Sequence, residues 1–190
     1  MMDDFGAAGL SAMAELNYLR LEAMDLFERC LTEGRPAFLE AFIEEQISQN
    51  PPRLDVLRDV AEDLHQRLLS LREYHFDVVE RTAQTLSDDF GVTLKLDAHA
   101  SPQGGESPLA PAHVLPLMRN LNPSLNSGDE ALVRRMLEMS AETAAQLRED
   151  IHMAEALFMY ISDWVDGLSA TAARRFWSDG RRDGHSGAVQ

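Results

Sequence analysis

Apolar residues recur every three or four positions along most of the chain, which is the spacing of one face of an α-helix. The first such pattern covers residues 9–32 and consists of Leu16, Leu19, Ala23, Phe27, Cys30 and Leu31. Gly34 follows it, and glycine is the residue that most often ends a helix. We therefore expect a first helix over residues 9–32.

Two further helices follow directly. Pro36 suits the first turn of a helix over residues 36–48, whose apolar positions are Phe38, Leu39, Phe42, Ile43 and Ile47. A third helix is expected over residues 52–87, since no Gly or Pro interrupts its interior. Its apolar positions are Leu57, Ala61, Leu64, Leu68, Leu71, Val79 and Leu86.

Residues 92–97 break the helical pattern. Val92, Leu94 and Leu96 alternate with polar residues, as they would in a half-buried β-strand. A lone strand is not stable in water, so three arrangements stay open. The segment lies extended on the helices, pairs with the same strand of a second copy, or adds to the sheet of a partner.

The composition changes to Pro, Ser, Asn and Gly after residue 97. We interpret residues 98–126 as a mobile linker that contains a short helix at 112–121, and we expect residues 98–107 to be disordered. The linker separates the helical part of residues 1–97 from a C-terminal part, residues 127–190.

The last long helix is expected to begin at Ser127, because Ser127 and Glu130 have the spacing of a capping box. Gly167 is expected to end or kink this helix near residue 166, and Ser169 could cap a further turn or two. The apolar positions are Val133, Met136, Leu137, Ala144, Leu147, Ile151, Ala154 and Phe158.

Together these elements predict an all-α fold. The expected architecture is an antiparallel helical bundle of three long helices plus shorter helices, with one short strand-like segment and a disordered linker. A chain of 190 residues has the usual size of a single domain. We therefore expect one domain overall.

Charge restricts the classes of partner. The chain carries 32 acidic and 17 basic residues, and its net charge is −15. Residues 1–50 hold ten acids and three arginines, whereas residues 173–190 hold four arginines and two acids. An acidic surface repels phosphates and anionic lipid headgroups. We therefore expect no nucleic acid and no membrane among the partners.

Cys30 is the only cysteine, so neither an intramolecular disulfide nor a cysteine-based zinc site can form. It stands on an apolar face, where we expect a small buried hydrophobe. Asp3 and Asp4 lie where a secretory signal would be basic. No apolar run approaches the roughly 18 residues of a membrane span. These features predict a cytoplasmic protein.

Two Glu-x-x-His pairs, Glu62 with His65 and Glu149 with His152, have the spacing that di-iron helical bundles use. At about 100° per residue, both glutamates fall on the side of their helix that lies away from the apolar stripe. We expect both to face solvent, which removes the interior metal site. The prediction is no metal, no cofactor and no catalytic residue.

His75 lies in phase with Leu57 on the apolar stripe of the third helix, so we expect it to be buried and hydrogen-bonded. The alternative is a metal, haem or pH-sensing role with Glu155 as its acidic companion, but two ligands are too few for a metal site. Four methionines are expected to fill the core, with an adaptable binding groove as the alternative: Met136, Met139, Met153 and Met159.

A basic aromatic sequence near the C-terminus is the other distinctive feature. Arg174, Arg175, Phe176 and Trp177 stand in an otherwise acidic chain, and Arg and Trp are favoured as interface anchors. These residues either dock on the protein's own body or bind a partner. We take them as candidate protein-binding residues.

Neither a Gly-x-Ser-x-Gly elbow nor a phosphate-binding loop occurs in the sequence. We therefore favour a non-enzymatic, acidic, helical interaction protein, such as a regulator, adaptor or chaperone-like factor. Its partner is expected to be a protein, with a homodimer as a further option. The alternative hypothesis is a helical-bundle metal- or cofactor-binding enzyme that uses His75 and nearby carboxylates.

Overall fold

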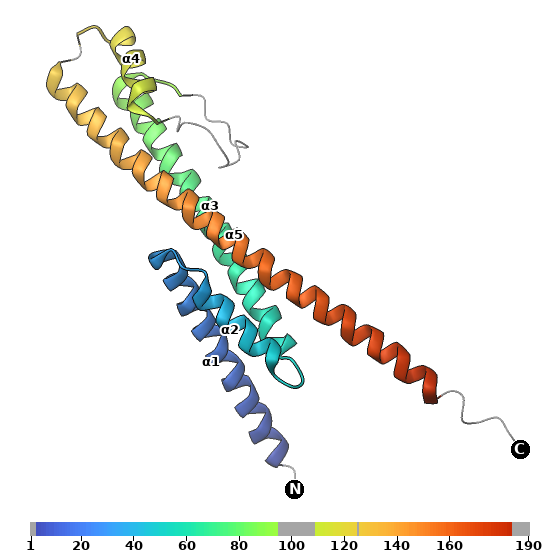
Figure 1. The fold of residues 1–190 in the computed structure, drawn as a ribbon. Coiled ribbons are helices and arrows are strands. Elements are labelled where there is room, and N and C mark those ends of the chain that lie inside the picture. Colours follow the sequence, from blue (N-terminus) through green and yellow to red (C-terminus); the bar gives the residue numbers. More distant parts are fainter. Residues whose placement is uncertain (1–2, 95–108, 125, 184–190) are drawn as a thin grey trace, which may run out of the picture. The chain divides into compact units, whose positions relative to one another are not determined.

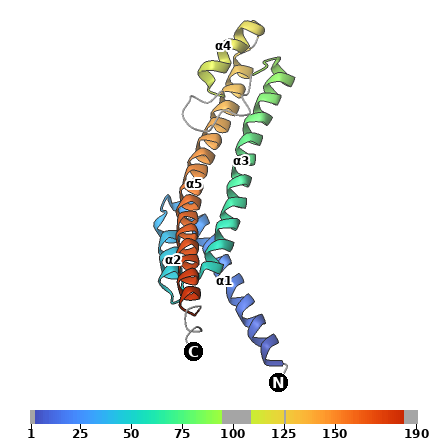
Figure 2. The same ribbon diagram turned by 90° about the vertical axis from the view of Figure 1, so that its right-hand side faces the viewer.

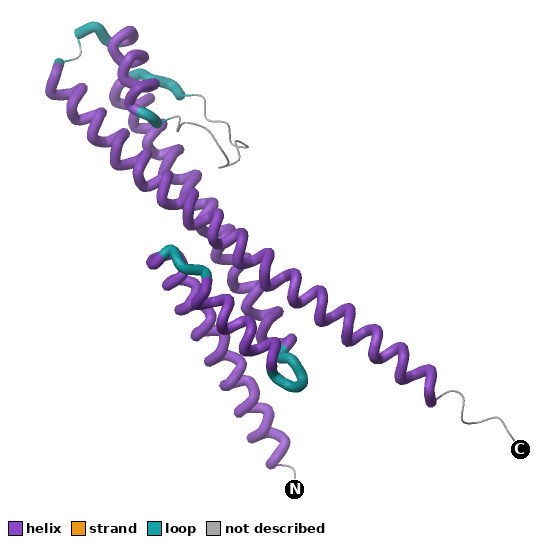
Figure 3. The backbone as a smooth tube through the Cα atoms, in the orientation of Figure 1, coloured by secondary structure: helices purple, strands orange, loops and turns teal. Residues whose placement is uncertain are grey.

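The computed structural model describes the backbone of residues 3–94, 109–124 and 126–183, and the side chains of residues 9–94, 109–124 and 126–171. Every regular element in this part of the chain is an α-helix (Figure 3). The protein is therefore all-α, as the apolar spacing predicts. The helices are α1 (Asp3–Glu33), α2 (Ala37–Ser48), α3 (Leu54–Phe90), α4 (Pro111–Leu121) and α5 (Ser127–Asp183), labelled in Figure 1.

The described chain divides into two compact units. Unit 1 comprises Met1–Arg67 and Met153–Gln190, and unit 2 comprises Leu68–His152. α1 and α2 belong to unit 1, α4 belongs to unit 2, and α3 and α5 contribute to both. The expectation of one domain overall stays a prediction.

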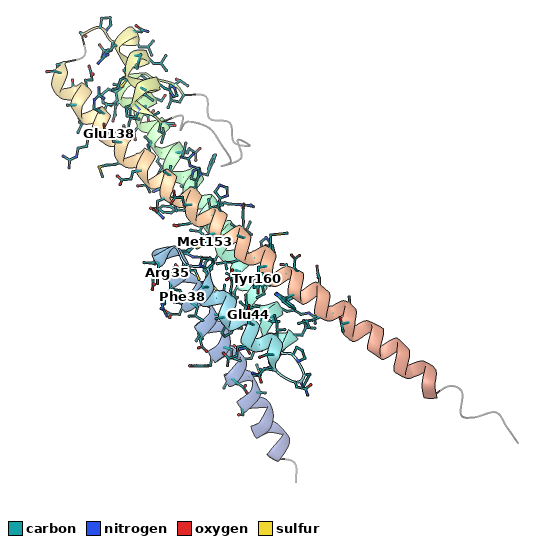
Figure 4. The ribbon with its side chains drawn as sticks, in the orientation of Figure 1. Arg35, Phe38, Glu44, Glu138, Met153 and Tyr160 are labelled. Carbon is teal, nitrogen blue, oxygen red and sulfur yellow. The ribbon has the colours of Figure 1, made fainter. Side chains whose placement is uncertain are left out.

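α1 and α2 form a helical hairpin in unit 1. Gly34 joins them with a φ of 65°, a conformation that glycine adopts without steric cost. The amide of Arg35 then donates to the carbonyl of Cys30 at 3.1 Å, which closes the end of α1. The guanidinium of Arg29 lies 4.3 Å from the centre of the Phe38 ring, at the start of α2 (Figure 4). A short connection therefore folds α2 back against α1.

The core of unit 1 draws on all four of its helical segments. Ala23, Phe27 and Cys30 are fully buried, and they share one face of α1 at the predicted spacing. The other buried apolar residues of this unit are Leu39, Phe42 and Ile43 from α2, Val56, Leu57, Val60 and Leu64 from α3, and Ala154, Leu157 and Ile161 from α5.

α1 and the first part of α3 run parallel, which corrects the expected antiparallel arrangement. Glu15 bonds to Arg53 at 2.8 Å, and Glu28 bonds to Arg67 at 2.7 Å, so partner numbers rise together along both helices. The physical reason is α2. This short helix returns the chain to the start of α1 before α3 begins, and two reversals leave α1 and α3 with the same direction.

α3 and α5 run antiparallel within each unit. In unit 1 the rings of His65 and Phe158 stack with centroids 5.3 Å apart, and Arg58 donates to Ser169 at 3.2 Å. In unit 2 the hydroxyl of Thr82 bonds to that of Ser140 at 2.9 Å. This long-helix pair is the part of the expected bundle that the contacts support.

Unit 2 has an apolar cluster of its own, which we call the unit 2 cluster. It joins α3, the segment after α3, the residues just before α4, α4 and α5 around side chains that are at most 5% exposed. Because five chain segments contribute to it, these side chains leave water together. Its members are Leu86, Val92, Leu109, Val114, Leu115, Met118, Val133 and Leu137.

The predicted strand is not confirmed. Residues 91–94 have no regular secondary structure, while residues 95–97 lie outside the described part of the chain. Gly91 ends α3 with a φ of 68°, and the amide of Val92 donates to the carbonyl of Leu86 at 3.0 Å. Val92 is buried, and Leu94 packs against the unit 2 cluster. The described half of the segment thus lies on the helices.

α4 confirms the short helix expected at residues 112–121, beginning one residue earlier at Pro111. Proline suits this position because the first helical amide needs no partner inside the helix. Arg119 of α4 forms an ion pair with Glu130 of α5. The disorder expected at residues 98–107 lies outside the described part of the chain.

The start of α5 differs from the prediction by one residue. The side-chain oxygen of Asn126 accepts hydrogen bonds from the amides of Gly128 and Asp129, both at 2.9 Å. Asn126 is therefore the N-cap, and Ser127 is already helical. Glu130 does not complete a capping box, because its carboxylate bonds to Arg119.

The end of α5 also differs. The helix passes through Gly167 without a break and continues to Asp183. A glycine inside a helix costs only about 1 kcal/mol relative to alanine, which neighbouring turns can offset. Thr171 adds a bond from its hydroxyl to the carbonyl of Gly167 at 2.9 Å. Gly167 is therefore an interior residue of one continuous helix.

Candidate protein-interaction surface

α1 carries a second apolar face that no other described residue covers. Leu10 and Leu21 are each 71% exposed, Tyr18 is 65% exposed and Met13 is 64% exposed. We call these four side chains the α1 stripe. At about 100° per residue they span roughly 140° of the helix surface. The core residues Ala23 and Cys30 lie on the opposite side.

The stripe begins on a part of α1 that extends past the neighbouring helices (Figures 1 and 2). Every residue from 9 to 15 is exposed, whichever side of the helix it occupies. Residues 5–14 also contain no charged side chain. A solvent-facing helix normally has a polar face, so this stretch has the composition of a helix that is covered.

Ion pairs hold α1 against α3. Arg20 donates to both carboxylate oxygens of Asp63, at 2.7 and 2.8 Å, and lies 3.7 Å from Asp59. The hydrogen bond to Asp63 raises the pKa of Arg20 above its ordinary value. Such bidentate pairs fix geometry as well as charge. They fix α1 against α3, while the four stripe side chains stay exposed.

Acidic side chains border the stripe on its other edge. Asp25 and Glu22 lie about 40° and 100° from Leu21 around the helix, and both are exposed. Neither carboxylate forms an ion pair within the described side chains. An uncovered apolar stripe with unneutralised acids at its edge can bind an apolar surface that carries positive charge.

The predicted binding residues near the C-terminus are placed only in part. Arg174, Arg175, Phe176 and Trp177 belong to the helical backbone of α5. Their side chains lie outside the described residues, so the choice between docking and partner binding stays a prediction. Trp164, a few turns earlier on α5, is 38% exposed.

The two Glu-x-x-His pairs belong to different units, Glu62 with His65 to unit 1 and Glu149 with His152 to unit 2. Glu62 and Glu149 are both exposed, as their helical phase predicts. His65 is half-buried and stacks on Phe158, whereas His152 is exposed. Among the residues with described side chains, no group of three or more His, Cys, Asp or Glu is placed to hold a metal ion.

His75 is half-buried, which corrects the expectation that it is fully buried. Burial lowers the pKa of its imidazole, and the positive charge of Arg148 lowers it further. Leu68 and Thr82, seven residues away on either side, are buried. His75 thus lies on the apolar line but keeps part of its polar ring in water, which reduces the cost of desolvation. Glu155, its expected companion, belongs to the other unit.

Cys30 is buried, as its apolar face predicts, and its thiol lies 3.7 Å from the carbonyl of Pro36. Burial raises the pKa of this thiol. The thiolate is the reactive form of cysteine, so burial suppresses it. Cys30 is therefore a packing residue of the α1–α2 hairpin.

The methionine prediction is wrong for two of the four residues. Met139 and Met159 are 60% and 57% exposed, while Met136 and Met153 are half-buried. Apolar spacing did not separate them, because a methionine counts as apolar on either side of a helix. Other exposed apolar side chains on α3, α4 and α5 share a helix face in pairs at most, as Leu117 and Leu121 do on α4, whereas four line α1.

Sequence reasoning missed the α1 stripe because the apolar face that contains Phe27 was enough to predict the helix, and no second apolar face was sought. The signal was present in a second set of apolar residues, Leu10, Met13, Tyr18 and Leu21, which fall on one side of the helix at about 100° per residue. The absence of charge over residues 5–14 was a second signal.

Together, the fold and this surface define an all-α protein with an uncovered, acid-bordered apolar helix face. Comparison with protein-family models, with curated proteins and with solved structures finds no match to the chain. None of the helices in the described part of the chain combines the length and apolar character needed to cross a membrane.

Proposed function

We propose that this chain is a non-enzymatic interaction protein that binds another protein through the α1 stripe. The observation that carries the proposal is the exposure of four large apolar side chains on one helical face, each between 64% and 71%. Contiguous exposed apolar side chains mark binding surfaces more often than scattered ones do. Regulators, adaptors and chaperone-like factors all act through such surfaces.

The magnitude of the apolar contribution favours a modest affinity. Burying one Leu or Met side chain contributes roughly 1.5–3 kcal/mol, so four partly exposed side chains supply on the order of 5–10 kcal/mol. Association costs an estimated 4–15 kcal/mol in lost freedom of motion. The stripe therefore needs help from charge at its edge, which the acids Glu22 and Asp25 can give.

The backbone of α1 gives independent support. Residues 9–14 are helical and exposed, with no contact to another helix among the described residues, and isolated helical segments of this length are marginal in water. Gly6 and Gly9 weaken the helix further, by about 1 kcal/mol each. A partner that packs along the stripe would stabilise this part of α1.

The acidic charge of the chain indicates the class of partner. We propose a protein with a neutral or basic surface, because the acidic chain repels nucleic acid and anionic lipid. We retain the cytoplasm as the proposed location on sequence grounds alone.

Site-specific photo-crosslinking in the native host tests the proposal. A photoreactive residue at Leu21 should give a discrete crosslinked protein band, and the same residue at exposed Glu44 of α2 is the matched control (Figure 4). A further change, Leu10→Glu, should reduce the Leu21 crosslink while leaving the melting temperature nearly unchanged, because Leu10 is exposed. Equal crosslinking at Leu21 and Glu44, or none at either, would contradict the proposal.

A further inference from the structure

We infer that the occupant of the α1 stripe is the basic aromatic segment of a second copy of this chain, residues 174–182. This inference rests on the proposed function and names its partner. The argument combines the charge at the stripe, the composition of the segment and the arrangement of helices in unit 1.

Two carboxylates beside the stripe are available to a cation from outside the unit. Two other carboxylates of α1 are already paired, Glu15 with Arg53 and Glu28 with Arg67. Glu22 and Asp25, beside the stripe, form no ion pair within the described side chains. A ligand with positive charge next to apolar groups would match this edge.

The C-terminal segment has that composition. Residues 173–190 form the one stretch of the chain with a clear positive excess, four arginines against two acids. Phe176 and Trp177 follow Arg174 and Arg175 directly. Large aromatic side chains would supply apolar area to Leu10, Met13 and Leu21, while arginines at the rim would meet the free carboxylates.

The helix arrangement points to a second copy rather than to the same chain. On α3, the residues that bond to α1 are Asp59, Asp63 and Arg67, and those that contact α5 are Arg58 and His65. These two sets lie roughly 100–180° apart around the helix. α1 and α5 therefore use different sides of α3 in unit 1.

A continuous helix cannot turn back across α3. α5 runs unbroken to Asp183, and its bond at Ser169 holds it to α3 just before the basic segment. Because α1 and α5 use different sides of α3, the segment of the same chain cannot reach the stripe without breaking α5. Two copies can exchange segments reciprocally, which gives a closed pair with two identical contacts.

A charge-swap experiment on the full chain tests the inference. Molar mass is measured by light scattering over a range of protein concentrations at low salt. The wild type should be dimeric, and the double change Arg174→Glu with Arg175→Glu should weaken dimerisation by at least about tenfold. Glu22→Arg with Asp25→Arg should weaken it similarly. All four changes together should restore the dimer.

Glu44→Arg with Glu45→Arg on α2 is the matched control, since both residues are exposed acids away from the stripe and should leave dimerisation unchanged. Far-UV circular dichroism checks that each variant stays helical. Trp177→Ala should also weaken the dimer without changing any charge.

Three results would overturn the inference: a monomeric wild type, a dimer insensitive to both double changes, or a failure of the combined variant to restore the dimer. A monomeric chain that still crosslinks another protein at Leu21 overturns this inference alone and leaves the proposed function standing.

Discussion

The unit 2 cluster and the α1 stripe contain similar side chains in opposite situations. Leu86 and Leu137 are fully buried among residues from five chain segments, whereas Leu10 and Leu21 are 71% exposed on a single helix. The difference lies in the neighbours rather than in the side chains. A leucine contributes to stability in proportion to the area that its own chain removes from water. The stripe therefore contributes little to folding and is free to contribute to binding.

The largest expected effect separates the two regions directly. Leu86→Ala should lower the free energy of unfolding by roughly 2–5 kcal/mol, because it leaves a cavity in a packed cluster. Leu21→Ala should change it by about 0.5 kcal/mol or less, as is usual for exposed sites. Chemical denaturation at low protein concentration measures both. A similar loss in the two variants would show that the stripe is covered within the chain.

The second comparison uses the same substitution in both regions. Gly91 ends α3 with a φ of 68°, and a Cβ added there would meet no atom within 4 Å. Backbone conformation alone should therefore make Gly91→Ala destabilising, by roughly 1–2 kcal/mol. Gly9 lies inside α1 and also has open space around it, so Gly9→Ala should stabilise α1 by roughly 0.5–1 kcal/mol. Opposite signs in thermal unfolding are the expected result. Two changes of the same sign would refute this account of Gly91.

A third prediction tests the N-cap of α5 in unit 2. Asn126→Ala should cost about 1 kcal/mol, since it removes the acceptor for the amides of Gly128 and Asp129. Ser127→Ala should stay within about 0.5 kcal/mol of the wild type, because its side chain has no capping role. Denaturant midpoints for the two variants decide between the cap in the structure and the cap that the sequence pattern favoured. The reverse order of effects would support Ser127.

Helical periodicity predicted most of the fold because apolar spacing is a local property of the chain. The helices around Phe27, Leu39 and Leu64 follow directly from it, and so does the burial of Cys30. The end of α5 could not be predicted, because Gly167 is a helix terminator only where packing does not oppose it. The parallel direction of α1 and α3 depends on how a short helix packs, which no local pattern encodes.

The candidate surface was harder to predict than the fold. Periodicity identifies apolar faces but not their coverage, so Leu21 and Phe27 look alike in the sequence and differ completely in exposure. The same ambiguity made Met139 and Met159 look like core residues. Alternation at Val92 and Leu94 similarly indicated a strand, although the same two residues are needed to cover the unit 2 cluster. Coverage is a tertiary property, and it decides which apolar residues are available for binding.

The smallest expected effect concerns His75 of unit 2, which is neither buried like the unit 2 cluster nor exposed like the α1 stripe. Burial and the charge of Arg148 lower its pKa in the folded state, so the unfolded chain binds a proton more readily than the folded chain does. Its contribution to stability is therefore present above the unfolded pKa of about 6.5 and declines as the pH falls below that value.

His75→Gln removes the titrating group and should make stability less dependent on pH between about 7 and 5. Urea unfolding at a series of pH values compares this variant with the wild type. The dependence should be small, because the ring is only half-buried and solvent screens its charge. An identical pH dependence in both proteins would mean that His75 has the same proton affinity in the folded and unfolded states.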